Sequence, residues 1–114
     1  MTSRERVYKA IRFEEPDRVP VDLGGTTGAS GIHVIAYRNL KRHLGLPHTV
    51  IRSNDAMQQL AMMEPEIMER LYVDVMQIST ALIAENWYEY PLFHDMPVSF
   101  PLKLDLAREA DGWM

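Results

Sequence analysis

The sequence predicts an α/β fold in which helices alternate with buried strands. Two short apolar runs, at 19–23 and 72–78, suit such strands, and apolar residues at helical spacing precede and follow the first of them. A glycine-rich loop at 24–31 joins that strand to the next helix. A parallel sheet needs more than two strands and a cover on both faces, so we expect the first part of a larger α/β fold.

Composition limits the classes of function. The 114 residues suffice for one domain, and a formal net charge of −4 disfavours a nucleic-acid partner. The chain has no cysteine, and no apolar run approaches the roughly 20 residues of a membrane span. We expect a cytoplasmic protein with no membrane partner and a single partial domain over 1–114, truncated because the end at 107–114 lacks a polar tail.

The first predicted helix begins after Thr2. Glu5 stands three residues later, at the spacing of a capping box, and apolar residues recur at helical spacing as far as Ile11. Pro16 ends the helix, and 14–18 form a charged turn before the strand.

The second predicted helix runs over 32–44. Gly45 suits a left-handed cap and Pro47 prevents continuation. Residues 50–52 are expected to be extended, followed by a short helix from Asn54 or Asp55 to residue 63. Pro65 fits the first turn of a further helix over 66–71.

The rest of the chain gives weaker signals. Pro91, Pro97 and Pro101 predict an irregular excursion over 81–101 after the second strand. Alternating apolar and charged residues predict an exposed strand over 102–106.

Three segments together resemble the uroporphyrinogen decarboxylase family. They are 4–22, then 36–47, and then 55–61 with 71–75, and both their order and their spacing agree with the family. The resemblance is closest to the branch of corrinoid-dependent methyltransferases. It implies that the chain is the N-terminal portion of a (β/α)8 TIM-type barrel, with the site at the carboxyl ends of the strands; a whole barrel needs about 250 residues.

This sequence departs from the family pattern in ways that favour one branch of the family over the other. The decarboxylases carry arginines after the first strand and an aspartate near the end of the second, whereas here 23–28 hold no arginine and 77–82 no carboxylate. The resemblance therefore favours corrinoid-dependent methyl transfer, the demethylation of a methylated donor, over tetrapyrrole decarboxylation in porphyrin biosynthesis. In the methyltransferase branch, late strands bind a zinc ion that activates a thiol, and the thiol takes the methyl group from a corrinoid (cobalamin) protein. We expect this chain itself to be inactive and to hold no metal or cofactor.

The candidate substrate-binding residues cluster at the ends of the two strands. Asp22 either faces substrate or accepts hydrogen bonds from the loop amides, and the loop is either mobile or an anion cradle. Gln77 and Ser79 alternate with apolar neighbours and are expected to face a barrel mouth. The full set is Asp22, Gly24, Gly25, Thr26, Thr27, Ser30, His33, Gln77 and Ser79.

Other candidates have a structural alternative. His43 and His48 suit surface positions, whereas His94 would belong to a lid over the site or to an ordinary loop. Five methionines between 57 and 76 favour core filling over a plastic binding surface. Unpaired strand edges predict self-association, so a non-catalytic self-associating module is the third hypothesis.

Overall fold

The computed structural model describes residues 1–93, 96–105, 108–109 and 112–113. It is a mixed α/β structure built around a four-stranded sheet with the order β2-β1-β4-β3. The strands are β1 (Ile51–Asp55), β2 (Leu60–Ala61), β3 (Tyr88–Phe93) and β4 (Met96–Phe100). β1 pairs with β4 in parallel, and the other two pairings are antiparallel. A separate ladder joins β5 (Arg108–Glu109) to β6 (Gly112–Trp113).

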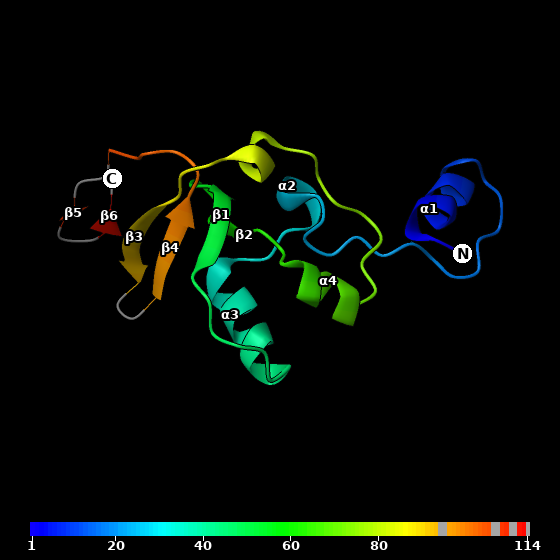
Figure 1. The fold of residues 1–114 in the computed structure, drawn as a ribbon, viewed down its shortest axis with the longest axis horizontal. Coiled ribbons are helices and arrows are strands. Elements are labelled where there is room, and N and C mark those ends of the chain that lie inside the picture. The colour runs from blue at the N-terminus through cyan, green and yellow to red at the C-terminus, as the bar shows by residue number, and fades with distance from the viewer. Residues whose placement is uncertain (94–95, 106–107, 110–111, 114) are drawn as a thin grey trace.

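The helices lie on one side of the sheet and beyond its end (Figure 1). They are α1 (Ser3–Ile11), α2 (Thr27–Ser30), α3 (Val34–His43) and α4 (Pro65–Arg70), with a 3₁₀ turn η1 (Thr80–Ile83). In the part of the chain that the structure describes, no helix is long and apolar enough to cross a membrane.

A core forms where α3 and α4 meet the sheet. Apolar side chains with 3% exposure or less come from α3, β1, β2, α4 and β4, and burial of such side chains is the main favourable term in folding. They are Val34, Tyr37, Ile51, Ala61, Ile67, Met96, Val98 and Phe100.

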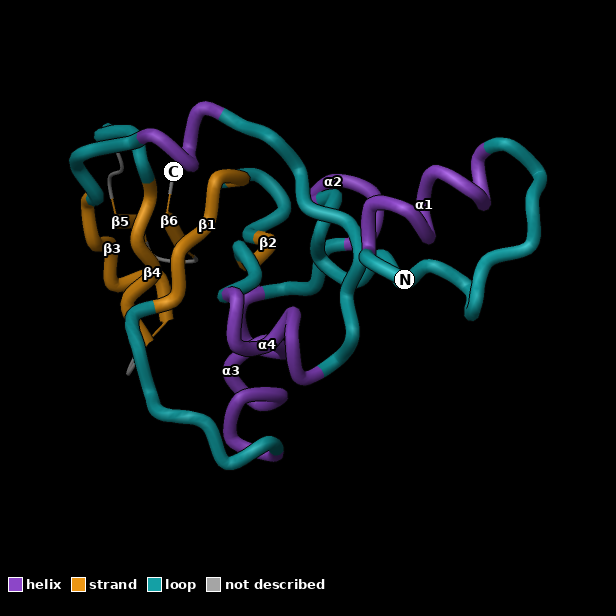
Figure 2. Tube along the Cα trace, turned by 45° about the vertical axis from the view of Figure 1, so that its right-hand side comes forward, coloured by secondary structure: helices purple, strands orange, loops and turns teal. Residues whose placement is uncertain are grey.

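The molecule is elongated. Its Cα radius of gyration is 16.1 Å and its extents are 53 × 29 × 26 Å, whereas a compact domain of this length has a radius of about 13 Å. Helix α1 lies at one end, away from the sheet, and β3 and β4 lie towards the other (Figure 2). α1 contributes nothing to the apolar core, and Ile11 and Phe13 at its carboxyl end are 66% and 100% exposed.

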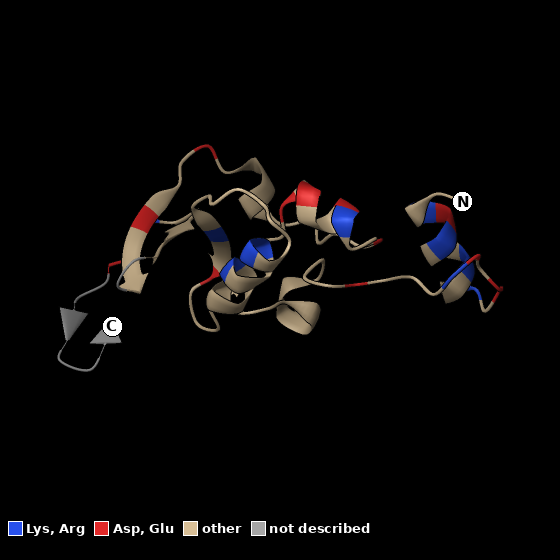
Figure 3. Cartoon of the chain, turned by 90° about the horizontal axis from the view of Figure 1, so that it is seen from below, with Lys and Arg blue, Asp and Glu red and all other residues tan. Residues whose placement is uncertain are grey.

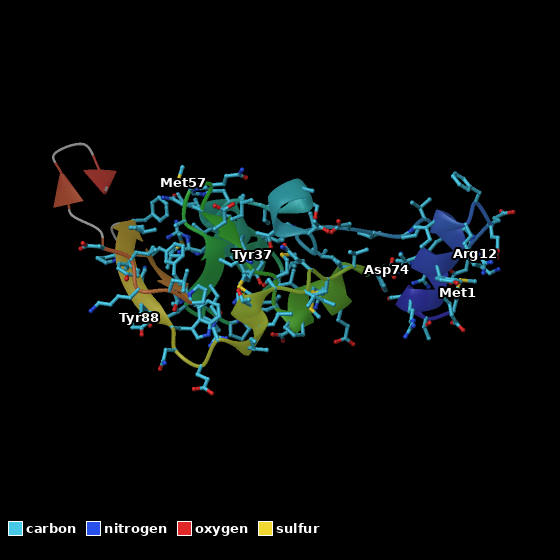
Figure 4. All side chains as sticks on the ribbon, turned by 90° about the horizontal axis from the view of Figure 1, so that it is seen from above. Met1, Arg12, Tyr37, Met57, Asp74 and Tyr88 are labelled. Atoms are coloured by element: carbon cyan, nitrogen blue, oxygen red, sulfur yellow. The ribbon has the colours of Figure 1, made fainter. Side chains whose placement is uncertain are left out.

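An ionic cluster joins α1 to the rest of the molecule. Asp74, whose side chain is fully buried, accepts hydrogen bonds from Arg6 at 2.6 Å and from Arg18 at 2.7 Å, and Arg6 also pairs with Asp17. Basic and acidic residues lie together on α1 and the turn after it (Figure 3). Asp74 lies on the side of the body nearest α1, whereas Tyr37 lies within the body (Figure 4).

Several predicted features are confirmed. Thr2 and Glu5 form the capping box of α1, Gly45 adopts φ +69° after α3, and Pro65 opens α4.

The two strands predicted at 19–23 and 72–78 are not strands in this structure. The segments run side by side, but one backbone hydrogen bond joins them, from Asp74 N to Val21 O, and a second, from Gln77 N to Gly25 O, follows just beyond the first segment. Val21 N donates to the Asp74 carboxylate instead of a main-chain carbonyl, and Pro20 has no N–H, so no ladder forms.

Other expectations in the second half of the chain are also wrong. Residues 55–63 form a turn and β2 rather than a helix, because Asp55 Oδ1 accepts hydrogen bonds from the N–H groups of Met57 and Gln58 and closes a tight turn. The predicted excursion contains β3 and β4. Residues 102–105 form no strand, and Leu106 lies outside the described residues.

Candidate functional site

The site is organised by two extended segments that run in parallel. Asp74 N donates to Val21 O at 2.8 Å, and Gln77 N donates to Gly25 O at 2.5 Å. Residue numbers rise together along both segments, so their carboxyl ends lie on the same side. Such ends are where α/β proteins place binding residues.

Gly25 allows the two segments to approach this closely, and Gly24 allows the loop to pack against Met63. A Cβ atom on Gly25 would overlap the carbonyl oxygen of Val75, and one on Gly24 would overlap the side chain of Met63. Gly24 also has φ +70°, a conformation that glycine adopts without strain. The start of the glycine-rich loop is therefore fixed by packing.

Asp22, Thr26 and Ser30 form a local hydrogen-bonded group. Asp22 Oδ1 accepts from Thr26 N at 3.0 Å and from Ser30 Oγ at 2.7 Å. Partial burial acts to raise the pKa of Asp22, but the hydrogen bonds from Ser30, Thr26 and Gly25 outweigh it and lower the pKa below its ordinary value. These are the contacts expected of an acceptor for the loop amides, the structural alternative for Asp22.

The loop amides have acceptors within the protein. Thr26 N bonds to Asp22, and Thr27 N donates to Gln77 Oε1 at 3.0 Å. Both N–H groups are thus engaged at the start of α2, a helix of only four residues. The described contacts support a packed loop rather than an anion cradle.

A cleft opens beside the carboxyl ends of the two segments. Its inner cavity, of about 40 Å³, lies against the glycines, and a wider outer part, of about 420 Å³, reaches the turn between β1 and β2. Thr27, Asn54 and Gln77 line both parts. Five of the predicted site residues line the inner cavity: Gly24, Gly25, Thr27, Gln77 and Ser79.

Methionines form much of the inner wall. Met62, Met63 and Met68 are partly buried and Met76 is 58% exposed, and all four line the inner cavity. Met57, by contrast, is 94% exposed and lines only the outer part. Flexible thioether side chains adapt to ligands of different shape, so these residues can both fill the interior and form a binding wall.

Asn54 is a site residue that the sequence does not indicate. It stands at a shift of register in β1, between Ser53, which pairs with Ala61, and Asp55, which pairs with Leu60. Such bulges redirect a side chain and are frequent beside active sites. Asn54 Oδ1 is buried and has no hydrogen-bond partner among the described residues. Only the hairpin, which the sequence does not predict, brings it to the cleft.

His33 lies outside the cleft. Its Nδ1 accepts from Ile35 N at 3.2 Å, so the ring caps α3, and its Nε2 lies 3.2 Å from Gln59 Oε1. The ring also meets Phe93 edge-on. His94 is outside the described residues.

The described residues do not fit a zinc ion. Within the described ranges, no three histidine, cysteine, aspartate or glutamate side chains gather in one place.

Comparisons of the chain with models of protein families, with curated proteins and with solved structures give no match.

Proposed function

We propose that this chain is the N-terminal part of an enzyme of the uroporphyrinogen decarboxylase family that acts in corrinoid-dependent methyl transfer. The observation that carries the proposal is the parallel pair of segments joined at Val21–Asp74 and Gly25–Gln77. Their carboxyl ends open on one cleft, as neighbouring strands of a (β/α)8 barrel would. Further barrel strands would complete the ladder that this pair lacks.

The charge of the cleft favours methyl transfer over tetrapyrrole decarboxylation. Among the described residues, no lysine or arginine lines either part of the cleft. Uroporphyrinogen carries eight carboxylates, which require cationic partners when they leave water. A small methylated donor does not require such cationic partners.

In this proposal the zinc ion is bound by a part of the enzyme outside this chain. Residues of this chain would bind and orient the methylated substrate at the cleft, while zinc and the activated thiol belong to late strands. In the proposed reaction the methyl group of the small donor would pass to cob(I)alamin, with the donor's leaving atom keeping the electron pair of the broken bond. The thiolate would then take the methyl group from methylcob(III)alamin, which would return cobalt to cob(I)alamin. The partner is a corrinoid protein, the location is the cytoplasm, and residues 1–114 alone are inactive.

The test uses the product of the whole reading frame that encodes this chain. Incubated with methylcob(III)alamin and a thiol, it should form cob(I)alamin and a methyl thioether, which visible absorbance and mass spectrometry follow separately. Substitution Gln77→Leu should raise the KM for the methylated substrate, because Gln77 lines the cleft and its side chain accepts a hydrogen bond from Thr27 N. Asn39→Leu, an exposed change on α3, is the matched control.

Each alternative gives a different result. Release of CO₂ from uroporphyrinogen without methyl transfer would replace the proposal with the decarboxylase. A reading frame that stops at residue 114, with neither reaction and a stable oligomer, would instead identify a non-catalytic self-associating module.

A further inference from the structure

A second cleft lies on the outer face of β1, bounded by the segment after β2 and by η1. The side chains of Ile51 and Ser53 are buried, so that of Arg52 between them points to the opposite face of the strand. Arg52 and Val50, two positions earlier, line the cleft, whereas Ile51 does not. The volume of the cleft is about 390 Å³, and sites for small molecules have about 300–1,000 Å³.

The guanidinium of Arg52 is held in place without being neutralised. Its Cζ lies 4.4 Å from the centroid of the Trp87 ring, a cation–π contact. The residue is exposed, and its side chain has no hydrogen bond or ion pair among the described residues. Glu89 stands two strands away in register, beyond Ser99, and does not pair with it. The N–H groups at the edge of the guanidinium therefore remain able to bind a carboxylate through two parallel hydrogen bonds.

The side chains that line the cleft carry one net positive charge. Glu64 is also part of the lining, but its Oε1 accepts hydrogen bonds from Lys41 and Thr49. Its Oε2 accepts from Lys41 at 2.7 Å and from Tyr37 at 2.6 Å, so both oxygens are used and Lys41 offsets the charge. The single charge left, that of Arg52, matches a monoanion, whereas a phosphate dianion would be only half compensated.

The remaining walls of the cleft are apolar. Methionine thioethers adapt to the shape of an apolar group, and two of them follow β2 at this point. Three of the lining residues, Met62, Met63 and Leu82, also line the inner cavity of the first cleft, so the two clefts share this wall. The apolar residues of the second cleft are Val50, Met62, Met63, Pro65 and Leu82.

We propose that the second cleft binds a small monocarboxylate with an apolar body, its carboxylate on the guanidinium of Arg52 and its body against Met62 and Met63. Aromatic and branched aliphatic carboxylic acids of about the size of benzoate have this chemistry. The site is distinct from the substrate cleft of the proposed function and does not rest on that function.

The test is a titration of the chain, labelled with ¹⁵N in arginine and with ¹³C in the methionine methyl groups. Benzoate and benzamide are a matched pair, since they have nearly the same shape and only benzoate is charged. Benzoate should shift the signals of Arg52 Nε and of the Met62 and Met63 methyl groups. It should bind about tenfold more tightly than benzamide, because a hydrogen bond between charged groups is stronger than one to a neutral amide. The signal of Met96, which is 1% exposed in the core, should not move.

Variants assign the preference to Arg52. Arg52→Gln should abolish the preference for benzoate, whereas Arg42→Gln, at an exposed arginine on α3, should retain it. Trp87→Leu should weaken benzoate binding about threefold and leave benzamide binding unchanged, because the ring holds the guanidinium in place. Where a variant fails to fold, the Arg52 Nε signal of the unmodified chain gives the assignment without a substitution.

Four results would overturn the inference. They are equal binding of benzoate and benzamide, a preference for benzoate that survives Arg52→Gln, loss of that preference in Arg42→Gln, and tighter binding of inorganic phosphate than of benzoate. None of them affects methyl transfer by the whole gene product, so a failure here is distinguishable from a failure of the proposed function.

Discussion

Arg6 Nη1 lies 2.6 Å from Asp74 Oδ1, across 68 residues of sequence. Arg18 reaches the other oxygen of the same carboxylate, and Val21 N donates to it as well. One buried carboxylate thus holds together α1, the turn after it and the two parallel segments of the site. The predictions begin with this group.

Substitution Arg6→Leu should release α1 from the body. Asp74 would lose one of its two guanidinium partners and Asp17 its only ion pair among the described residues, while the exposed apolar residues of α1 offer little compensation. Hydrogen exchange should show faster exchange of α1 amides, with protection of α3 unchanged. Arg12→Leu is the control, since the Arg12–Glu14 pair is exposed and 3.7 Å long. Equal effects of the two substitutions would contradict the role of Arg6.

Docking of α1 should fail in acid. The hydrogen bond from Arg6 lowers the pKa of Asp17 to about 2, from an ordinary 3.8. Burial of Asp74 acts to raise its pKa, but hydrogen bonds from Val21, Ser3, Arg18 and Arg6 hold it well below its ordinary value. A depressed carboxylate pKa stabilises the folded state above the unfolded value, and the stabilisation is lost as pH falls from about 3.8 through the folded pKa.

Arg6 side-chain NMR signals should therefore stay unchanged down to about pH 4 and move in the range below it, where these carboxylates become protonated. In Arg6→Leu, α1 should show no docking transition in this range. Release of α1 at neutral pH in the unmodified chain would be inconsistent with the assignment.

Gly25→Ala should destabilise the chain by about 1–3 kcal/mol, the usual cost of inserting a methyl group into a packed contact. The new Cβ would overlap a main-chain oxygen, Val75 O, which cannot rotate away. Gly28→Ala is the matched control: it meets nothing within 4 Å, and in a helical position it should be neutral or stabilising by about 0.5–1 kcal/mol. Urea unfolding measures both, and similar midpoints would refute the close approach.

Tyr37→Phe should cost about 1–3 kcal/mol, the range for leaving a buried polar group without its partner. The Tyr37 hydroxyl donates to Glu64 Oε2 at 2.6 Å and accepts from Glu64 N at 3.0 Å, so the substitution removes two of the hydrogen bonds that hold the start of α4. Thermal unfolding gives the difference. Tyr8→Phe, at a tyrosine 55% exposed on α1, should change stability by less than about 0.5 kcal/mol.

The chain should self-associate through the outer side of the two parallel segments. Val19, Tyr72 and Ile78 are 80%, 72% and 91% exposed, and such patches favour contacts with other chains. Sedimentation at micromolar concentration should show a dimer or larger assembly that Ile78→Asp weakens and Met57→Asp, at the hairpin turn, does not. A monomer that unfolds cooperatively would count against the expectation, and with it against the barrel interpretation.

Local signals in the sequence predicted local structure well. Capping at Thr2 and Glu5 and the left-handed cap at Gly45 depend on neighbouring residues alone. The β3–β4 pairing was missed because prolines argue against strands. Pro97 is tolerated because no N–H is needed for a ladder at its position. It precedes Val98, which pairs in parallel with Ile51, and it lies within a shift of register opposite β3.

For the candidate site too, features that depend on neighbouring residues can be predicted from the sequence, and features that depend on distant residues cannot. Gly24, Gly25 and Gln77 could be proposed as site residues because a glycine-rich loop and polar residues within an apolar run are visible in sequence, and all three line the cavity. Asn54 could not, since its position depends on a bulge in a hairpin that tertiary pairing creates. Asp74 reads as an ordinary polar residue within an apolar run, and its cluster depends on partners 53 to 68 residues away.

That separation bears on the order in which the chain folds. Closing a loop costs more entropy as the loop lengthens, and contacts distant in sequence form late. The β3–β4 hairpin closes within 13 residues (88–100), whereas the Arg6–Asp74 bond must wait until the two parallel segments have met. In pulse-labelling hydrogen exchange, amides of β4 should gain protection before those of α1. The N-terminal helix would then be the last element to dock, although it is the first to be synthesised.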